Sequence, residues 1–592
     1  MKRTFATKLA VIAFLLLLPA SSSSAKENWI KVKSKNFTVI GNGGERDIRK
    51  LATKLEEFRH VLSLLFPKAR IETPVPTTVF LFKSHASFKP FKPQYKGKTR
   101  ENVGGYFLAF ADGNYIALTS ELGGIDPHQV IFHEYEHFVT RNNLPNAPPW
   151  LDEGLAEYFS TFTTSDDGRK ASIGAPIPRH IFTLREGRFL PLDTLFKVNR
   201  KSPHYNESGK AGIFYAQSWA LVQFLMLHNG GKRQPQLMKF IDGLSAGIPV
   251  EENFRQSFQA DYKTIERELR SYLTKLPFPS LSITFPKQLD FAKDTARIPM
   301  PEAEVQYYLG DLLLRGRRFD EAEVYLKKSR ELDANFTMSQ ISLGILRLGQ
   351  NRLPEARKLL ESAIASDSRN YLGHLHYAHV LSREERYEEA ITSYQQAIQL
   401  KPEVAQSYSD LGYAYLNLGR DEDAVASFKQ ATRLDPRNPY LYRSRSYVYL
   451  RLARGTFAGS DARMYLRLQG WHDDHSPYMA LALHFGLRQS KQATPASNVL
   501  AEAATKLTAS EWPYPVIRYL QRQITAPELL ALATDNDKLT EAHAYIGLDL
   551  SLSGIREEAL RHLHWVRENG NKDFIEYPLA LAEIGRITAS GG

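Results

Sequence analysis

The residues most able to do chemistry are His133-Glu134-Tyr135-Glu136-His137, an H-E-x-x-H pattern. Residues four apart lie on one face of an α-helix, so His133 and His137 can bind one metal ion together. Glu134 projects beside them, where its carboxylate can take a proton from a water molecule held by the metal. The pattern predicts zinc-dependent hydrolysis. Because charged surface helices also produce it, the neighbouring segments must decide between the two interpretations.

The segment around this pattern predicts a helix. Asp126 is a suitable N-cap, Pro127 suits the first helical position, and Gln129 stands where a capping box places it. The helix should end near Asn143, before Pro145. The pattern therefore lies in the middle of a regular element.

A second helix is expected over residues 150–160, after the prolines 148–149. Catalytic zinc takes three protein ligands and keeps one open position. Glu153 is the expected third ligand. Glu157, one turn further along the same face, is placed to accept the free N–H of a ligand histidine and fix its ring.

H-E-x-x-H followed by W-L-D-E-G-L-A-E-Y resembles the gluzincin metallopeptidases, most closely the bacterial peptidase MA-like domains, and also the aminopeptidase N family. The resemblance implies one Zn²⁺ held by His133, His137 and Glu153, with Glu134 as general base. Fifteen residues separate His137 from Glu153, fewer than in the aminopeptidase N family, and no G-A-M-E-N segment occurs. Aminopeptidase specificity is therefore not expected. Thr140 and Asn143 replace the Gly and His that a metzincin requires.

A predicted hairpin precedes the first helix, and its first strand begins near Gly104-Gly105-Tyr106-Phe107. In gluzincins a strand at this point borders the cleft and can pair with extended substrate backbone. The resemblance implies that substrate-binding role for these residues. The alternative is an ordinary hairpin packed under the helix.

Tyr215 lies in a strongly predicted helix over residues 212–228. In the aminopeptidase N family a tyrosine at the head of such a helix stabilises the tetrahedral intermediate, and Tyr215 resembles it in position. Its phenol would donate a hydrogen bond to the developing oxyanion. The Q-S that follows departs from the family's Y-x-K-G, so a buried structural tyrosine is the alternative. His180 and His204 lie in loop-like sequence and receive no role.

The N-terminal residues 1–25 have the pattern of a secretory signal peptide: basic residues, an apolar run over 9–18 and a Ser-rich stretch ending at Ala25. No later apolar run reaches the roughly twenty residues of a spanning helix, so no transmembrane segment is expected after signal removal. An uncleaved N-terminal anchor is the alternative. The chain has no cysteine, so neither a disulfide nor a lipid-anchoring cysteine is expected. From the signal pattern we expect an exported bacterial protein, periplasmic or extracellular.

The composition is that of a globular protein, with 43% hydrophobic and 24% charged residues. The formal charge of +11 comes from basic residues that are dispersed along the chain. They do not gather with aromatic residues in a nucleic-acid motif. The excess favours an anionic cell envelope, and nucleic acid is not an expected partner.

The first folded unit is expected over residues 26–278, with strands, a helix from 47 to 66 and the two chemistry-bearing helices. Residues 279–302 contain several prolines without a clear period and are predicted to be a linker.

A 34-residue period begins at residue 303. Small residues recur at two positions of each unit, Gly310, Gly344, Ala378 and Gly412 at the first and Ala322, Ala356, Ala390 and Ala424 at the second. This is the tetratricopeptide repeat pattern, with four repeats over 303–438. Residues 439–592 are expected to form degenerate helical repeats and a cap.

The sequence thus predicts an α+β chain, a gluzincin-type metallopeptidase domain of small sheet plus helices followed by an all-α repeat solenoid. Such solenoids present a concave face for extended peptides or partner proteins. The predicted function is an exported zinc metallopeptidase acting on a peptide or protein substrate, with a substrate or protein partner recruited by the repeats. A rigid spacer is the alternative for the repeats. The alternative for the whole chain is an exported repeat scaffold with a catalytically inactive metallopeptidase-like domain.

Overall fold

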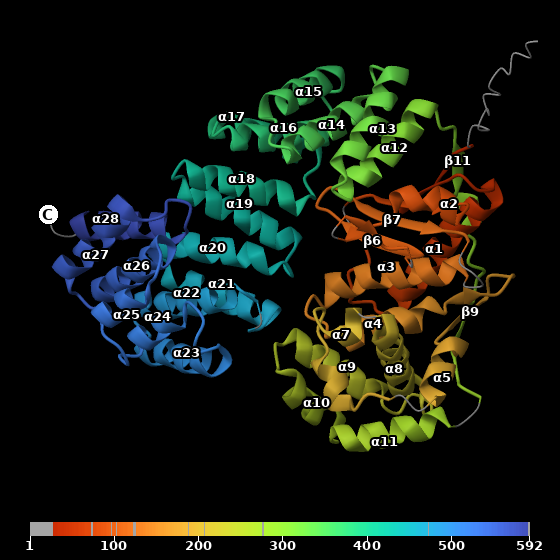
Figure 1. Ribbon diagram of the computed structural model, residues 1–592, viewed down its shortest axis with the longest axis horizontal. Coiled ribbons are helices and arrows are strands. Elements are labelled where there is room, and N and C mark those ends of the chain that lie inside the picture. The colour runs from red at the N-terminus through yellow and green to blue at the C-terminus, as the bar shows by residue number, and fades with distance from the viewer. Residues whose placement is uncertain are drawn as a thin grey trace, which may run out of the picture.

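The computed structural model describes residues 28–589 except 73–74, 96, 102, 122–125, 187–188, 207, 275–276 and 472. The predicted signal peptide lies outside the described residues. Figure 1 shows a mixed α/β N-terminal unit and a helical solenoid that begins over the sheet and curves down along one side of that unit. No helix in the described part of the chain is long and apolar enough to cross a membrane.

A six-stranded sheet organises the N-terminal unit, with strand order β11-β1-β2-β3-β7-β6. Strands β2, β3 and β7 run parallel to one another, and the remaining pairs are antiparallel. All six residues of β3 are buried, as expected for a strand covered on both faces. The strands are β1 (Ile30–Lys33), β2 (Phe37–Gly41), β3 (Thr77–Phe82), β6 (Gly105–Ala109), β7 (Asn114–Thr119) and β11 (Ala296–Ile298).

Helices α1 (Glu45–Leu65) and α3 (Pro127–Asn143) cover one face of this sheet. The opposite face is covered by the first helix of the solenoid, α12 (Glu302–Arg315), whose Leu309 and Leu312 share an apolar core with Phe80 and Phe82 of β3. The solenoid is therefore part of the packing of the sheet.

The rest of the N-terminal unit is mainly helical, and most of its helices lie below the sheet in Figure 1. Its helices are α2 (His85–Phe88), η1 (Lys89–Phe91), α4 (Pro149–Ser160), α5 (Pro178–Arg185), α6 (Leu192–Lys197), α7 (Pro203–Asn206), α8 (Ser208–Leu227), α9 (Gln234–Ser245), α10 (Val250–Phe258), α11 (Tyr262–Leu273) and η2 (Ala292–Asp294). Two small sheets complete it, formed by β4 (Gln94–Tyr95) with β5 (Lys98–Thr99), and by β8 (Thr163–Thr164), β9 (Lys170–Ile173) and β10 (Leu281–Thr284).

Residues 279–302 differ from the linker that the sequence predicts. They supply β10, which pairs with β9, and β11, which pairs with β1 through Lys31 and Ile298. Their partners lie more than a hundred residues earlier in the chain, so no local period marks them. This segment belongs to the folded N-terminal unit.

The solenoid stacks helix pairs in the register that the sequence predicts. The turn inside each pair holds one residue with positive φ, at Arg317, Asn351, Glu385, Gly419 and Ala453. These positions are 34 apart, so the register continues one pair beyond residue 438. The helices after α12 are α13 (Phe319–Leu332), α14 (Thr337–Gly349), α15 (Leu353–Ser366), α16 (Tyr371–Arg383), α17 (Tyr387–Leu400), α18 (Ala405–Asn417), α19 (Asp421–Leu434), α20 (Pro439–Arg451), α21 (Gly455–Gln469), α22 (Ser476–Gln489), α23 (Ala493–Lys506), α24 (Tyr514–Leu520), α25 (Ala526–Leu532), α26 (Asn536–Leu552), α27 (Arg556–Asn569) and α28 (Glu576–Ala589).

The tip of the β6–β7 hairpin joins the two units. Asp112 is 8% exposed and accepts two hydrogen bonds of 2.7 Å from the guanidinium of Arg315 on α12. His376 of α16 places its Nε2 3.5 Å from the same carboxylate. The hairpin tip is thus held by helices of the first and third repeats.

Candidate metal centre

Helices α3 and α4 carry the predicted ligands. Asp126 caps α3, since its side chain accepts a hydrogen bond from the backbone N–H of His128 at 2.9 Å, and Pro127 is the first helical residue. Helix α4 packs closely on α8. A Cβ at Gly154 would lie 2.6 Å from the backbone oxygen of Ser218, so glycine is required for this approach.

Three ligand atoms converge between α3 and α4. The Nε2 atoms of His133 and His137 are 3.1 Å apart. Oε2 of Glu153 lies 3.5 Å from the first and 3.4 Å from the second. The structure therefore brings together the three residues that the sequence predicts as metal ligands, from two helices.

The geometry of this group fits one zinc ion. A tetrahedral ion with bonds of about 2.0–2.1 Å keeps its ligand atoms roughly 3.3–3.4 Å apart, close to the separations found here. Glu153 is only 2% exposed, and its Oε2 is buried without a hydrogen-bond partner among the described residues. A buried carboxylate oxygen normally has a partner, and a cation at this point would supply one.

Asp152 orients the ring of His137. Its Oδ1 lies 2.9 Å from Nδ1 of His137, so that nitrogen carries the proton and Nε2 presents its lone pair to the ligand group. Arg200 donates a hydrogen bond of 2.9 Å to the other carboxylate oxygen.

Glu157 lies behind His133, on the predicted side. Its Oε1 is 3.8 Å from Nδ1 of His133, which is longer than a hydrogen bond. Its Oε2 is 3.1 Å from Nε2 of His180 and 3.5 Å from Arg179. Burial raises the pKa of Glu157, yet the contact with His180 and nearby cations lower it to about 2, so the residue is a carboxylate.

Glu134 adjoins the ligand histidines on α3. Burial raises the pKa of its carboxyl group, and His133 and His137 partly offset that rise. A carboxylate whose pKa is shifted toward neutrality is suited to accept a proton and pass it on. The neighbouring Glu136 is turned toward Thr140, whose hydroxyl donates to it at 2.5 Å.

Glu136 also forms a second acidic group with His137 and Asp152, with one atom of each within 4.8 Å of the others. Within it, Nδ1 of His137 lies at hydrogen-bonding distance from Asp152. We interpret it as the hydrogen-bonded support of the first group.

Two tyrosines border Glu153. Tyr205 of α7 donates a hydrogen bond of 2.6 Å to Oε1 of Glu153, leaving Oε2 for the ligand group. The ring of Tyr215, the predicted oxyanion donor on α8, lies beside Tyr205 with 6.2 Å between centroids. Burial and then the Glu153 carboxylate raise the pKa of Tyr215, so its phenol stays protonated and can donate. The structure places both tyrosines next to the centre.

Strand β6, which contains three of the predicted substrate-binding residues, forms one edge of the large sheet. A Cβ at Gly105 would lie 2.7 Å from Val130, and the ring of Phe107 is 5.6 Å from that of Phe138. These two α3 residues bracket the H-E-x-x-H segment, so β6 runs alongside it. Tyr106 points to the other face, where its hydroxyl donates to the Phe91 carbonyl oxygen at 2.7 Å.

No role is predicted from the sequence for Asp152, His180 or Tyr205. The signal for Asp152 was present, because it is a second acid directly before Glu153 at the start of an otherwise apolar helix. His180 and Tyr205 had no such signal. They reach the centre from α5 and α7, at positions that no period or motif links to α4.

A family described as TPR repeat matches residues 378–419 and 412–452. A comparison with curated proteins found no match. Solved structures similar to part of the chain include one described as a functional characterization of Pseudomonas aeruginosa pilF, at 21% identity over 38% of this chain and 98% of that one, with a TM-score of 0.32.

Two further solved structures are similar to about a third of this chain. YrrB, described as a TPR protein with an unusual peptide-binding site, is 15% identical over 34% of this chain and 98% of its own, with a TM-score of 0.30. MamA from Desulfovibrio magneticus RS-1 is 19% identical over 30% and 100%, with a TM-score of 0.27. At these scores the likenesses add nothing to the family match and the 34-residue register. The C-terminal region of this chain is therefore a solenoid of tetratricopeptide repeats, a module for protein interaction.

Proposed function

We propose that the protein is an exported zinc-dependent metallopeptidase of the gluzincin type, in which the repeats recruit a protein substrate or partner. The observation that carries the proposal is the convergence of His133, His137 and Glu153 at separations suited to one tetrahedral ion, with Oε2 of Glu153 buried and without a hydrogen-bond partner among the described residues. The proposed location of the protein outside the cytoplasm depends on the signal-like residues 1–25.

These three residues would hold one Zn²⁺, which would supply Lewis-acid chemistry, polarising a peptide carbonyl and acidifying a water molecule. Glu134 removes the proton from the attacking water and delivers it to the leaving amine, a role that its raised pKa favours. Tyr215, kept protonated by its raised pKa, donates to the developing oxyanion. Asp152 holds His137 in the tautomer that leaves Nε2 available.

The test combines metal analysis with a chelator-sensitive assay on an unstructured protein such as casein. We expect one zinc per chain in the wild-type protein and in Glu134→Gln, with turnover by Glu134→Gln reduced by about 10²–10⁴. His133→Ala should lose the metal. Full activity in Glu134→Gln would contradict this mechanism, and stoichiometric zinc without any proteolysis would support the scaffold alternative.

A further inference from the structure

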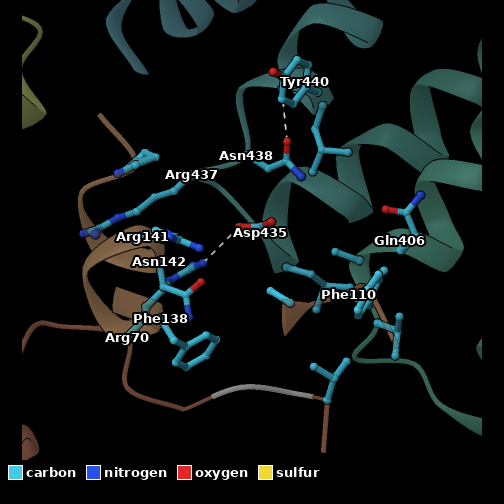
Figure 2. A pocket seen from close by; sticks show the side chains of 18 of the residues that line it. Arg70, Phe110, Phe138, Arg141, Asn142, Gln406, Asp435, Arg437, Asn438 and Tyr440 are labelled. Atoms are coloured by element: carbon cyan, nitrogen blue, oxygen red, sulfur yellow. Dashed lines mark hydrogen bonds and ion pairs between the residues drawn. The ribbon is translucent and has the colours of Figure 1, made fainter. Parts of the chain in front are cut away.

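A cavity of about 740 Å³ lies between the N-terminal unit and the solenoid. The C-terminal end of α3 and the turn after β6 form one side, and the turns that lead into α18 and α20 form the other (Figure 2). Neither unit encloses it alone. Its volume is in the range of ligand-binding pockets.

This cavity adjoins the candidate metal centre. Glu134, Phe138 and Arg141 are four and three residues apart on α3, so they share one helix face, and the latter two line the cavity. The edge strand β6 ends at Ala109, which also lines the cavity. An extended chain paired with β6 would pass from the metal centre into it.

Not every arginine that lines the cavity is paired with a carboxylate. Arg437 donates to the backbone and side-chain oxygens of Asn143, which are neutral acceptors. In the described part of the chain neither Arg437 nor Arg141 forms an ion pair with a carboxylate. Burial and the nearby Arg70 lower the pKa of Arg437, so its cation lacks compensation.

Two of the acidic residues that line the cavity are paired with arginines. Asp435 is engaged by Arg70 at 3.6 Å, and Glu72 by Arg59 at 2.9 Å. Glu403 is exposed. Figure 2 shows Arg70, Arg141 and Arg437 on one side together with Phe138, Asp435 between the two sides, and Phe110 on the other side. The cavity therefore combines a cationic side, which Phe138 adjoins, with an apolar side at Phe110.

We propose that this cavity is the subsite for an acidic residue of an extended peptide, whose carboxylate binds Arg141 and Arg437 while a neighbouring apolar side chain packs on Phe110 and Phe138. The proposal rests on the proposed function, because it names the class of substrate that the metal centre would receive. A peptide fits better than a free anion because the edge of β6 leads into the cavity and the apolar side needs an apolar group.

The test measures binding without turnover, on full-length protein carrying Glu134→Gln. The probes are two short fluorescein-labelled peptides of the same apolar sequence, one with a central Asp-Glu pair and the other with Asn-Gln. We expect fluorescence anisotropy to show about tenfold or tighter binding of the acidic peptide, as charge-assisted hydrogen bonds predict. Arg141→Gln and Arg437→Gln should each remove most of that preference.

Arg433→Gln is the matched control, since Arg433 is exposed on α19 one turn before Arg437 and does not line the cavity. It should keep the full preference. Arg437 also contacts Asn143, so its substitution disturbs more than the proposed site. The side chain of Arg141 is exposed, and Arg141→Gln tests the site without disturbing that contact. Equal binding of the two peptides, an equal loss in Arg433→Gln, or displacement of the acidic peptide by equimolar inorganic phosphate would overturn the proposal. Acidic-peptide binding by a protein that cleaves nothing would support the subsite and reject the peptidase function.

Discussion

His133 and His137 are supported by different acids, and the support is unequal. Asp152 lies 2.9 Å from Nδ1 of His137, whereas Glu157 is 3.8 Å from Nδ1 of His133 and is engaged by His180. A hydrogen bond that fixes a ligand ring increases metal affinity. Because the two distances differ, removing Asp152 and removing Glu157 should lower the metal affinity by different amounts.

We expect Asp152→Asn to weaken zinc binding about ten- to a hundredfold, and Glu157→Gln to weaken it less. Competition with a chromophoric chelator measures both. Asp166→Asn, on an exposed turn, is the control and should bind zinc as the wild-type protein does. A larger loss in Glu157→Gln than in Asp152→Asn would show that His133 is the more dependent ligand.

At the scale of elements, the packing of α4 on α8 positions Glu153. Gly154→Ala would place a methyl group 2.6 Å from both the Ser218 backbone oxygen and Val222. We expect it to reduce the free energy of unfolding by about 1–3 kcal/mol and to weaken zinc binding, because α4 must move away. Urea unfolding and the chelator titration measure the two effects.

Gly212→Ala is the matched control on α8, where a Cβ would meet no atom within 4 Å. Alanine is favoured over glycine inside a helix, so this change should stabilise the protein by about 0.5–1 kcal/mol. Equal destabilisation by both substitutions would mean that the glycines matter through backbone freedom and that close packing at Gly154 is not the cause.

The C-terminal helices contain a pair of buried acids. Burial, and then the charge of Glu576 on α28, raise the pKa of Glu541 on α26 to about 8, although Trp512 and Tyr478 donate hydrogen bonds to its carboxylate. The folded state thus keeps a proton that the unfolded chain releases near its ordinary value of about 4.3. Stability from this group is present below that value and is lost as the pH rises to about 8.

Glu541→Gln should therefore stabilise the protein more at pH 8 than at pH 5.5, by about 1–3 kcal/mol. The difference in Tm between variant and wild type at each pH isolates this group from the other titrating residues. Glu557→Gln, exposed on α27, should give the same small difference at both values. A Glu541→Gln effect independent of pH would show that Glu541 is ionised in the folded state.

At the scale of the whole molecule, the sheet and the solenoid share one core. The face of α12 that meets the sheet carries Tyr308, Asp311 and Arg315, three or four residues apart. Asp311 accepts hydrogen bonds from Tyr115 of β7 at 2.6 Å and from Ser342 of α14 at 2.8 Å. The sheet, the first repeat and the second are thereby joined at one carboxylate.

Asp112→Ala should destabilise the protein by about 1–3 kcal/mol, because the buried Arg315 loses its bidentate partner and keeps only Asp311, whose carboxylate lies 3.7 Å from its Nε. Combining it with Arg315→Met should cost less than the sum of the two single losses, since the unmade hydrogen bonds of the guanidinium are removed as well. Urea unfolding of the two single variants and the double variant gives the coupling between the residues. Additive losses would mean that the hairpin tip is held by packing alone.

Local signals predicted the elements that carry the centre. Asp126 and Pro127 mark the start of α3, and the 34-residue period places the repeat helices. These features depend on neighbours in sequence. The pairing of β11 with β1, and the approach of Tyr205 to Glu153, join residues far apart in the chain, so no local pattern contains them.

The sequence by itself determined which residues could bind a metal, because the spacing of His133 and His137 on a helix is a property of the helix. It also determined the repeat register, through small residues at fixed intervals. Only the tertiary structure decided that Asp152, and not Glu157, is hydrogen-bonded to a ligand ring, that the solenoid covers the second face of the sheet, and that both units enclose a cavity beside Glu134. Each of these depends on how separate elements pack. The distances between side chains of different elements are set by the whole fold, so no local pattern predicts them.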